Sequence, residues 1–445
     1  MTQRPTADVR PRKAVRRWRR GLSVSVGLGV GLFVAGALWL GPGDTDPISV
    51  RGPSAGPPRG SVPALLEDLR RLPRNHAGWA QLGMAYVQEG RTTADPALYA
   101  KADSALRRSL KVQPRDNYQA ETAMGALAAA RHDFRTALAW GRKAAATNPS
   151  NAAAQGVLAD AYTQLGRYEE SYRAVQRMTD LRPDVSSLAR ASYTWELRGD
   201  IAQARTLMRR ALESAATPGD KAFARLHLAT LAQDAGDART ALREAQDGLS
   251  AAPEDAPLLE ARARAHAALG HDQQAVADYT AAVEIVPLPQ YLLGLGELQQ
   301  SLGDTEEAND QYEVLRAHEK VRGASGEPAD VDAILFEADH GAARLAVGMG
   351  AAAARERPFI AVQDAYAWAL HRAGRNAEAL RYADRALDLG TPSALFHYHR
   401  AMIRLALEDP SAREDLARAL AIDPHFHPLH APRARAALSR IEGTS

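Results

Sequence analysis

Histidine is the residue type whose clustering could support chemistry. Five of the 13 histidines lie between residues 397 and 430. His397 and His399 are two positions apart in an expected helix, about 200° around its axis, so they cannot face one site. His425, His427 and His430 stand at an expected helix start, where an irregular backbone could bring two imidazoles to Asp423 as metal ligands. The alternative, which we favour, makes these histidines packing or capping residues, so we assign no metal site.

The other usual signs of catalysis are missing from the sequence. The chain has no cysteine, which excludes disulfides, zinc–thiolate sites and cysteine nucleophiles. It also has no glycine-rich phosphate loop, no nucleophile elbow and no His-Glu-x-x-His helix. We therefore expect a protein that is not an enzyme, with no catalytic residue and no cofactor.

Small residues recur at intervals of 33 to 38 along most of the chain. The series consists of Ala102, Ala137, Ser171, Ala204, Ala241, Ala275, Ala308, Ala346, Ala379 and Ala412. Two antiparallel helices approach closely only where a small side chain separates their backbones. The interval therefore predicts about ten helix pairs that stack to share a core.

Turn residues keep the same interval. Expected turn glycines are Gly166, Gly199, Gly236, Gly270, Gly303, Gly341 and Gly374. Expected helix-ending prolines are Pro114, Pro149, Pro183, Pro218, Pro253, Pro287, Pro358, Pro392 and Pro424. Glycine permits the open backbone after a first helix, and proline cannot continue a second one.

These positions resemble the tetratricopeptide repeat. The third unit has Leu158, Ala159, Tyr162, Gly166, Tyr168, Ser171 and Pro183 on the spacing of that family. The resemblance covers about Val62 to His430 and implies an all-α, right-handed superhelical solenoid with a concave groove that binds peptides or protein segments.

The resemblance also implies which residues face the groove. In each repeat the second, fifth, ninth, twelfth and thirteenth positions point inward. Those selected here are Asp160, Gln164, Arg190, Tyr193, Glu196, His227, Gln233, Glu260, Arg264, Glu297, Trp368, His371 and Arg372. Tyr193 and Trp368 would be the anchors if exposed, and ordinary packing residues if not.

The N-terminal sixty residues predict a membrane anchor. Residues 1–20 form a basic tail with eight Lys/Arg and one Asp, and residues 21–40 contain no charge and are long enough to span a bilayer. Basic residues before the span place the N-terminus in the cytoplasm and the repeats outside the cell membrane. A cleaved signal peptide and a twin-arginine export signal are weaker alternatives. Residues 41–60, with five glycines and five prolines, form a linker.

Charge argues against a nucleic-acid partner. The whole chain has a formal charge of +2 and residues 1–20 carry +7, while residues 21–60 are neutral, so residues 61–445 carry −5. A mildly acidic repeat region lacks the basic face that binds phosphates.

The repeats divide unevenly. We expect repeats 1–7 with a capping helix at 61–322, a glycine-containing hinge at 323–329, repeats 8–10 at 330–426 and a C-terminal capping helix at 427–445. An insertion at about 91–96 lengthens the first repeat.

The function expected from these features is a membrane-anchored scaffold that binds other proteins of a bacterial envelope. The stretches 286–291 and 364–370 are similar to a cassette found in tetratricopeptide proteins of the bacterial envelope. Residues 62–86 are similar to repeat domains of cytochrome c maturation factors, which keeps open a second function. In that alternative, the protein presents an extended client, such as an apocytochrome, to membrane machinery. A third possible function is that of a metal-handling accessory protein that uses the C-terminal histidines.

Overall fold

The computed structural model describes residues 60–93, 95–324 and 329–443. The predicted tail, membrane span and linker lie outside these residues except for Gly60, and residues 325–328 of the predicted hinge do too. In the described part, every regular element is an α-helix. None of these helices combines the length and apolarity needed to cross a membrane.

Ten helix pairs follow one another along the described chain. The first helices are α3 (His76–Thr93), α5 (Tyr118–Ala130), α7 (Ala152–Gln164), α9 (Val185–Leu197), α11 (Pro218–Gln233), α13 (Ala256–Ala268), α15 (Pro289–Leu302), α17 (Val331–His340), α19 (Ile360–Arg372) and α21 (Ala394–Ala406). The second helices are α4 (Ala97–Val112), α6 (Phe134–Thr147), α8 (Tyr168–Leu181), α10 (Ile201–Ser214), α12 (Ala238–Ala251), α14 (Asp272–Ile285), α16 (Thr305–Ala324), α18 (Ala343–Glu356), α20 (Asn376–Leu387) and α22 (Ala412–Ile422). The flanking helices are α2 (Val62–Arg71) and α23 (His430–Gly443). We number the pairs as repeats 1–10.

The recurring small residue lies at the crossing of each pair. All ten members of the series fall in the second helices, and each is at most 1 % exposed. Ser171 shows the same role with a polar side chain, because its hydroxyl donates to the Ala159 carbonyl of the first helix at 2.9 Å. The predicted repeat interval is confirmed.

Six of the seven expected turn glycines adopt positive φ angles, between 68° and 92°. Gly341 is the exception, with φ −131°, because the Glu337 carboxylate lies beside it and accepts the Ala342 amide at 3.0 Å. His132 and Glu408 take the same turn position in repeats 2 and 10 with φ of 59° and 57°. Pro218 also departs from its expected role. It starts α11 after the Thr217 cap instead of closing α10.

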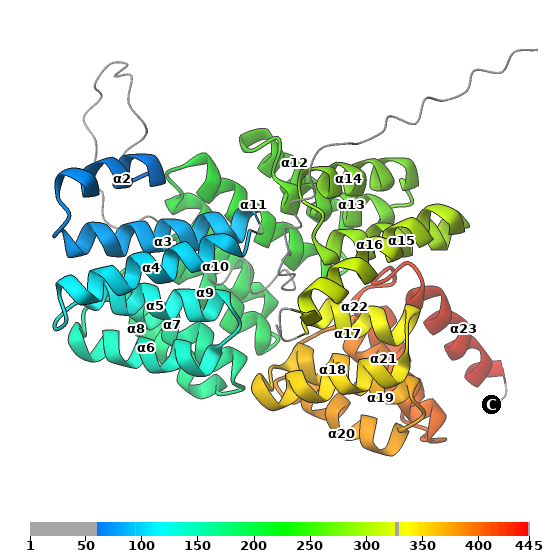
Figure 1. Ribbon diagram of the computed structural model, residues 1–445. Coiled ribbons are helices and arrows are strands. Elements are labelled where there is room, and N and C mark those ends of the chain that lie inside the picture. Colours follow the sequence, from blue (N-terminus) through cyan, green and yellow to red (C-terminus); the bar gives the residue numbers. More distant parts are fainter. Residues whose placement is uncertain (1–59, 94, 325–328, 444–445) are drawn as a thin grey trace, which may run out of the picture.

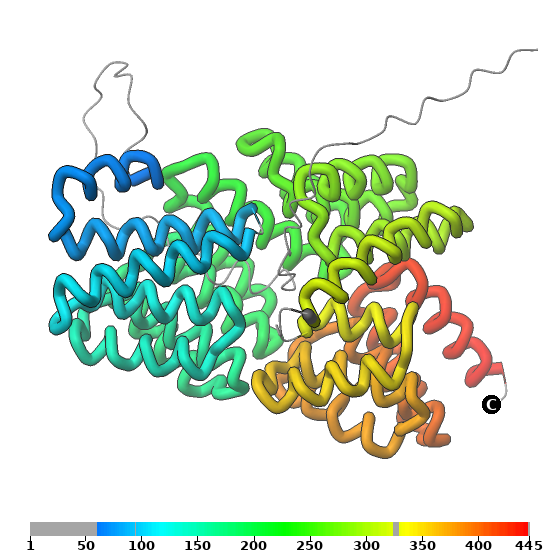
Figure 2. Tube along the Cα trace, viewed as in Figure 1, coloured from blue at the N-terminus to red at the C-terminus, as the bar shows by residue number. Residues whose placement is uncertain are grey.

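The superhelix closes on itself, so that repeats 2–5 contact repeats 8–10. Figures 1 and 2 show the blue-to-green stack beside the yellow-to-orange one. Three hydrogen bonds cross the contact: Arg135 Nη2 to the Arg355 carbonyl (3.0 Å), the Ile360 amide to the Tyr168 hydroxyl (3.0 Å) and Thr391 Oγ1 to the Leu197 carbonyl (2.6 Å). We call this contact the closure. Buried Leu197, Phe359 and Ile360 form its apolar centre.

Candidate binding cavities on the inner surface

All thirteen predicted groove residues lie on first helices, as the family pattern implies. The closure leaves cavities along these helices. The larger cavity, of about 430 Å³, is lined by Gln233, Glu260, Arg264 and Glu297 from the predicted set. The smaller cavity, of about 300 Å³, is lined by Gln164, Tyr193, Glu196 and Arg264. A third, of about 330 Å³, is lined by Trp368, His371 and Arg372.

Asp160, Arg190 and His227 line none of these three cavities. Asp160 and Arg190 form a buried two-point ion pair between α7 and α9, at 2.9 Å (Nε to Oδ1) and 2.7 Å (Nη2 to Oδ2). Burial lowers the pKa of His227 to about 4, so this ring is neutral at physiological pH. The ion pair shows that Asp160 and Arg190 contact each other within the repeats.

Trp368 is not an exposed anchor. Its ring is 2 % exposed and stacks on His399 with ring centres 4.2 Å apart. Its Nε1–H donates to Asp339 Oδ2 at 3.0 Å. The packing alternative therefore holds for Trp368, because α17, α21 and α23 all supply side chains around it. Tyr193 is half-buried and faces the smaller cavity.

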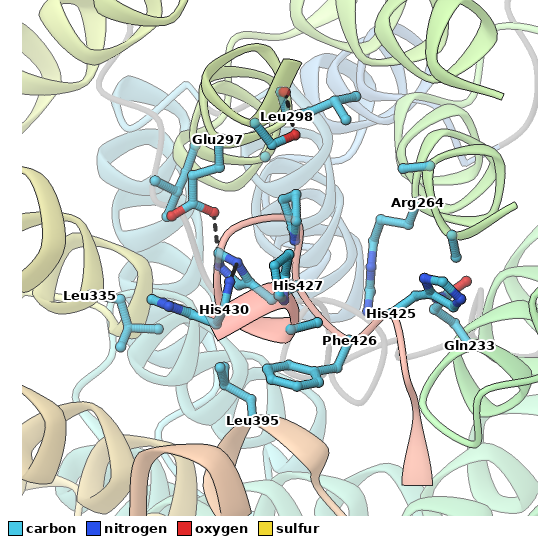
Figure 3. Close-up of a pocket in the computed structure, with 18 of the residues that line it drawn as sticks. Gln233, Arg264, Glu297, Leu298, Leu335, Leu395, His425, Phe426, His427 and His430 are labelled. Carbon is cyan, nitrogen blue, oxygen red and sulfur yellow. Dashed lines mark hydrogen bonds and ion pairs between the residues drawn. The ribbon is translucent and has the colours of Figure 1, made fainter. Parts of the chain in front are cut away.

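The C-terminal histidines pair with separate carboxylates. The loop between α22 and α23 points His427 into the larger cavity, where its Nε2 lies 3.1 Å from Glu297 Oε2 (Figure 3). His430 Nε2 lies 3.2 Å from Asp339. His397 contacts Asp415 within repeat 10, and His399 of repeat 10 contacts Asp364 of repeat 9. Across the described ranges, no group of three or more histidine and carboxylate side chains is placed so that it could hold a metal ion.

Two kinds of carboxylate line the larger cavity. Burial alone would raise the pKa of Glu297, but the His427 charge and hydrogen bonds from His340 and His427 outweigh it, and the pKa is lowered. Burial raises the pKa of Glu260 to about 7, with Arg264 opposing the rise and Asp234 adding to it. Burial also raises the pKa of Asp332, assisted by the charges of Asp330, Glu260 and Glu297. Glu297 therefore has partners that lower its pKa, whereas the partners of Glu260 and Asp332 do not offset the effect of burial.

Residues 122–193 match a family model described as tetratricopeptide repeat. This match spans repeats that have the same helix pairing and buried small residue as the other pairs. The chain has a tetratricopeptide repeat fold. No curated protein matches it.

Several solved structures share the repeat architecture at low identity. PilW, a type IV pilus biogenesis factor, is 20 % identical, with 45 % of this chain and 92 % of PilW covered and a TM-score of 0.39. A thermophilic repeat protein of Thermus thermophilus is 23 % identical over 44 % of this chain and 98 % of its own, with a TM-score of 0.38. The human IFIT1 dimer with PPP-AAAA is 15 % identical, with 81 % of this chain and 85 % of the IFIT1 chain covered and a TM-score of 0.45.

Sequence reasoning missed three parts of the tetratricopeptide inner surface. Gln290 and Asp332 line the larger cavity as the second residues of α15 and α17. The second-position rule of the family would have found both. The loop residues His425, Phe426 and His427 enter the same cavity, and no repeat pattern predicts them because the loop follows the last pair.

Proposed function

We propose that this protein is a membrane-anchored scaffold that holds other envelope proteins by binding segments of them inside its superhelix. Tetratricopeptide folds are protein-interaction scaffolds, and the proposal assigns no catalysis to this one. The observation that carries the proposal is the pair of cavities on the inner face of the first helices, each lined by apolar residues and a few polar ones. A preformed concave site with few converging polar groups is typical of ligand binding.

Membrane attachment is supported by the sequence. The run Arg16-Arg17-Trp18-Arg19-Arg20 precedes twenty uncharged residues, a pattern that orients a span with its N-terminus in the cytoplasm. The repeats then lie outside the cytoplasmic membrane. Protease added to spheroplasts should digest the repeats and leave an N-terminal tag intact. Protection of the repeats until the cells are lysed would contradict this topology.

Partner capture tests the scaffold role. In-cell crosslinking and affinity purification should be run on the full-length chain and on residues 61–445 exported without the span. The same folded envelope protein in both samples supports a scaffold whose specificity lies in the repeats. Loss of every partner from the exported form would move the function to the span and tail.

The same experiment distinguishes the scaffold from the alternative function, a maturation factor. A maturation factor that presents extended clients should retain unfolded polypeptides, such as an apocytochrome, and release them once they fold. A scaffold should instead retain folded partners after washing. The cavities, of about 430 and 300 Å³, fit side chains or a short segment better than a long extended chain, which favours the scaffold.

A further inference from the structure

Four of the side chains that line the larger cavity each have a buried oxygen atom. These atoms are Gln233 Oε1, Glu260 Oε2, Gln290 Oε1 and Asp332 Oδ2, one from each of the successive first helices α11, α13, α15 and α17. None of these four atoms has a hydrogen-bond partner in the described part of the chain. Gln233 and Glu260 are 6 % and 4 % exposed. All four atoms accept hydrogen bonds and none can donate in the charged or amide form.

Buried acceptors without partners are costly. Each costs about 1–3 kcal/mol relative to a satisfied group, and more if it is charged. Native proteins keep few such groups, so four along one cavity wall call for an explanation. The group that would satisfy them is a donor with several N–H bonds.

The charge of the cavity wall points to a cationic donor. Glu297 and Asp339 have histidine partners within 3.2 Å. The ion-pair partner of Glu260 is Arg264, whose Nε lies 3.9 Å from Glu260 Oε1. Arg264 makes its closer contact with Asp234, at 3.3 Å from Nη2 to Oδ1. Asp332 has no ion pair among the described residues. Burial raises the pKa of both Glu260 and Asp332, and the nearby charges of Arg264 and Arg357 oppose this rise only in part.

We propose that the larger cavity binds the guanidinium or ammonium group of an arginine or lysine side chain carried by the partner segment. A guanidinium has five N–H donors in a plane and can bridge carboxylate and amide oxygens on adjacent helices. Gln233 and Gln290 supply neutral acceptors, and Glu260 and Asp332, which alternate with them along the successive first helices, supply the charge. This inference rests on the proposed function, because the segment belongs to the bound protein.

The experiment compares two peptides with the full-length chain in nanodiscs. Both are acetylated nine-residue glycine–serine peptides, one with a central arginine and one with citrulline, which keeps the shape and removes the charge. Calorimetry at fixed ionic strength should give at least tenfold tighter binding of the arginine peptide. Glu260→Gln and Asp332→Asn should each reduce that binding at least fivefold. Asp310→Asn, an exposed carboxylate on α16, is the matched control for net charge and should change nothing.

Circular dichroism confirms that each variant is folded before binding is measured. Equal affinity for the arginine and citrulline peptides, or unchanged binding in both cavity variants, would overturn the inference. If partner capture in cells persists in these variants, the scaffold function survives that result. Free agmatine that binds while the arginine peptide does not would identify a small-amine site and overturn the assignment to a partner segment.

Discussion

Two buried carboxylates have pKa values that are shifted in opposite directions. Glu260 and Asp415 are 4 % and 3 % exposed. Burial raises the pKa of Glu260 to about 7 because Arg264 compensates it only partly. Burial would also raise the pKa of Asp415, but hydrogen bonds from His397 and Arg400, with the charges of Arg400 and Arg404, lower it to about 2. The hydrogen bonds and charges of its cationic partners allow Asp415 to stabilise the fold as an anion.

Replacing Glu260 with glutamine should stabilise the protein at alkaline pH. A carboxyl whose pKa rises on folding binds more protons in the folded state, so stability is lost as pH rises from about 4.5 through about 7. Glu260→Gln removes this loss, which amounts to roughly 3 kcal/mol above pH 8. The groups facing Glu260 are Asp234, Arg264, Tyr279, Tyr291 and Asp332. Urea unfolding at pH 5 and pH 8 measures the effect, and equal pH dependence in both proteins would contradict it.

Asp415→Asn should have the opposite effect. Its folded pKa is depressed, so its contribution is present above pH 3.8 and is lost as pH falls through about 2. The variant leaves Arg400 and Arg404 without this buried partner, with only the more exposed Asp384 and, for Arg404, Asp409 remaining, and should cost about 3 kcal/mol at pH 7. Urea unfolding at pH 7 measures this cost. A cost below about 1 kcal/mol would show that Asp384 replaces Asp415.

At the scale of helices, the sequence predicted the pairs because their rules are local. A small residue at the crossing and a glycine at the turn act within one pair, so the buried series and six turn glycines could be found from spacing. The predictions for Gly341 and Pro218 were wrong because neighbouring side chains determine the backbone conformation at both positions. Glu337 occupies the turn beside Gly341, and Thr217 caps a new helix at Pro218.

The turn glycines provide a matched test of the closure. Gly199, Gly236, Gly270 and Gly374 have φ angles between 74° and 80°. A Cβ on Gly199 would lie 2.7 Å from the Gly390 carbonyl oxygen, and one on Gly236 would lie 2.6 Å from that of Ile422. Gly270 and Gly374 have no such neighbour within 4 Å.

Alanine at Gly270 or Gly374 should therefore cost about 1–2 kcal/mol from backbone strain alone. Alanine at Gly199 or Gly236 should cost about 1–3 kcal/mol more, because the extra carbon meets backbone across the closure. Thermal unfolding of the four single variants gives the comparison. Equal costs at all four positions would mean that the closure does not form in solution.

At the scale of the whole molecule, the closure converts the expected open groove into separate cavities. Repeat proteins usually contact only their sequence neighbours. Here hydrogen bonds join residues 192 to 220 positions apart and divide the expected groove into cavities. The sequence predicted the inward-facing residues from helix faces, but the closure depends on small rotations summed over ten pairs. No local sequence pattern encodes the sum of these rotations, so the closure and the cavities that it leaves could not be predicted from the sequence.

Tyr168→Phe should weaken the closure without touching any helix pair. The hydroxyl of Tyr168 accepts the Ile360 amide across the closure, and its loss leaves a part-buried N–H unpaired, at a cost of about 1–2 kcal/mol. Tyr162→Phe is the control, since its hydroxyl receives only an exposed 3.4 Å contact from Arg142 and should cost less than about 0.5 kcal/mol. Hydrogen exchange of the Ile360 amide should quicken in the first variant only. If exchange quickened throughout repeats 8–10 as well, the closure would be the contact that makes the two halves of the superhelix unfold together.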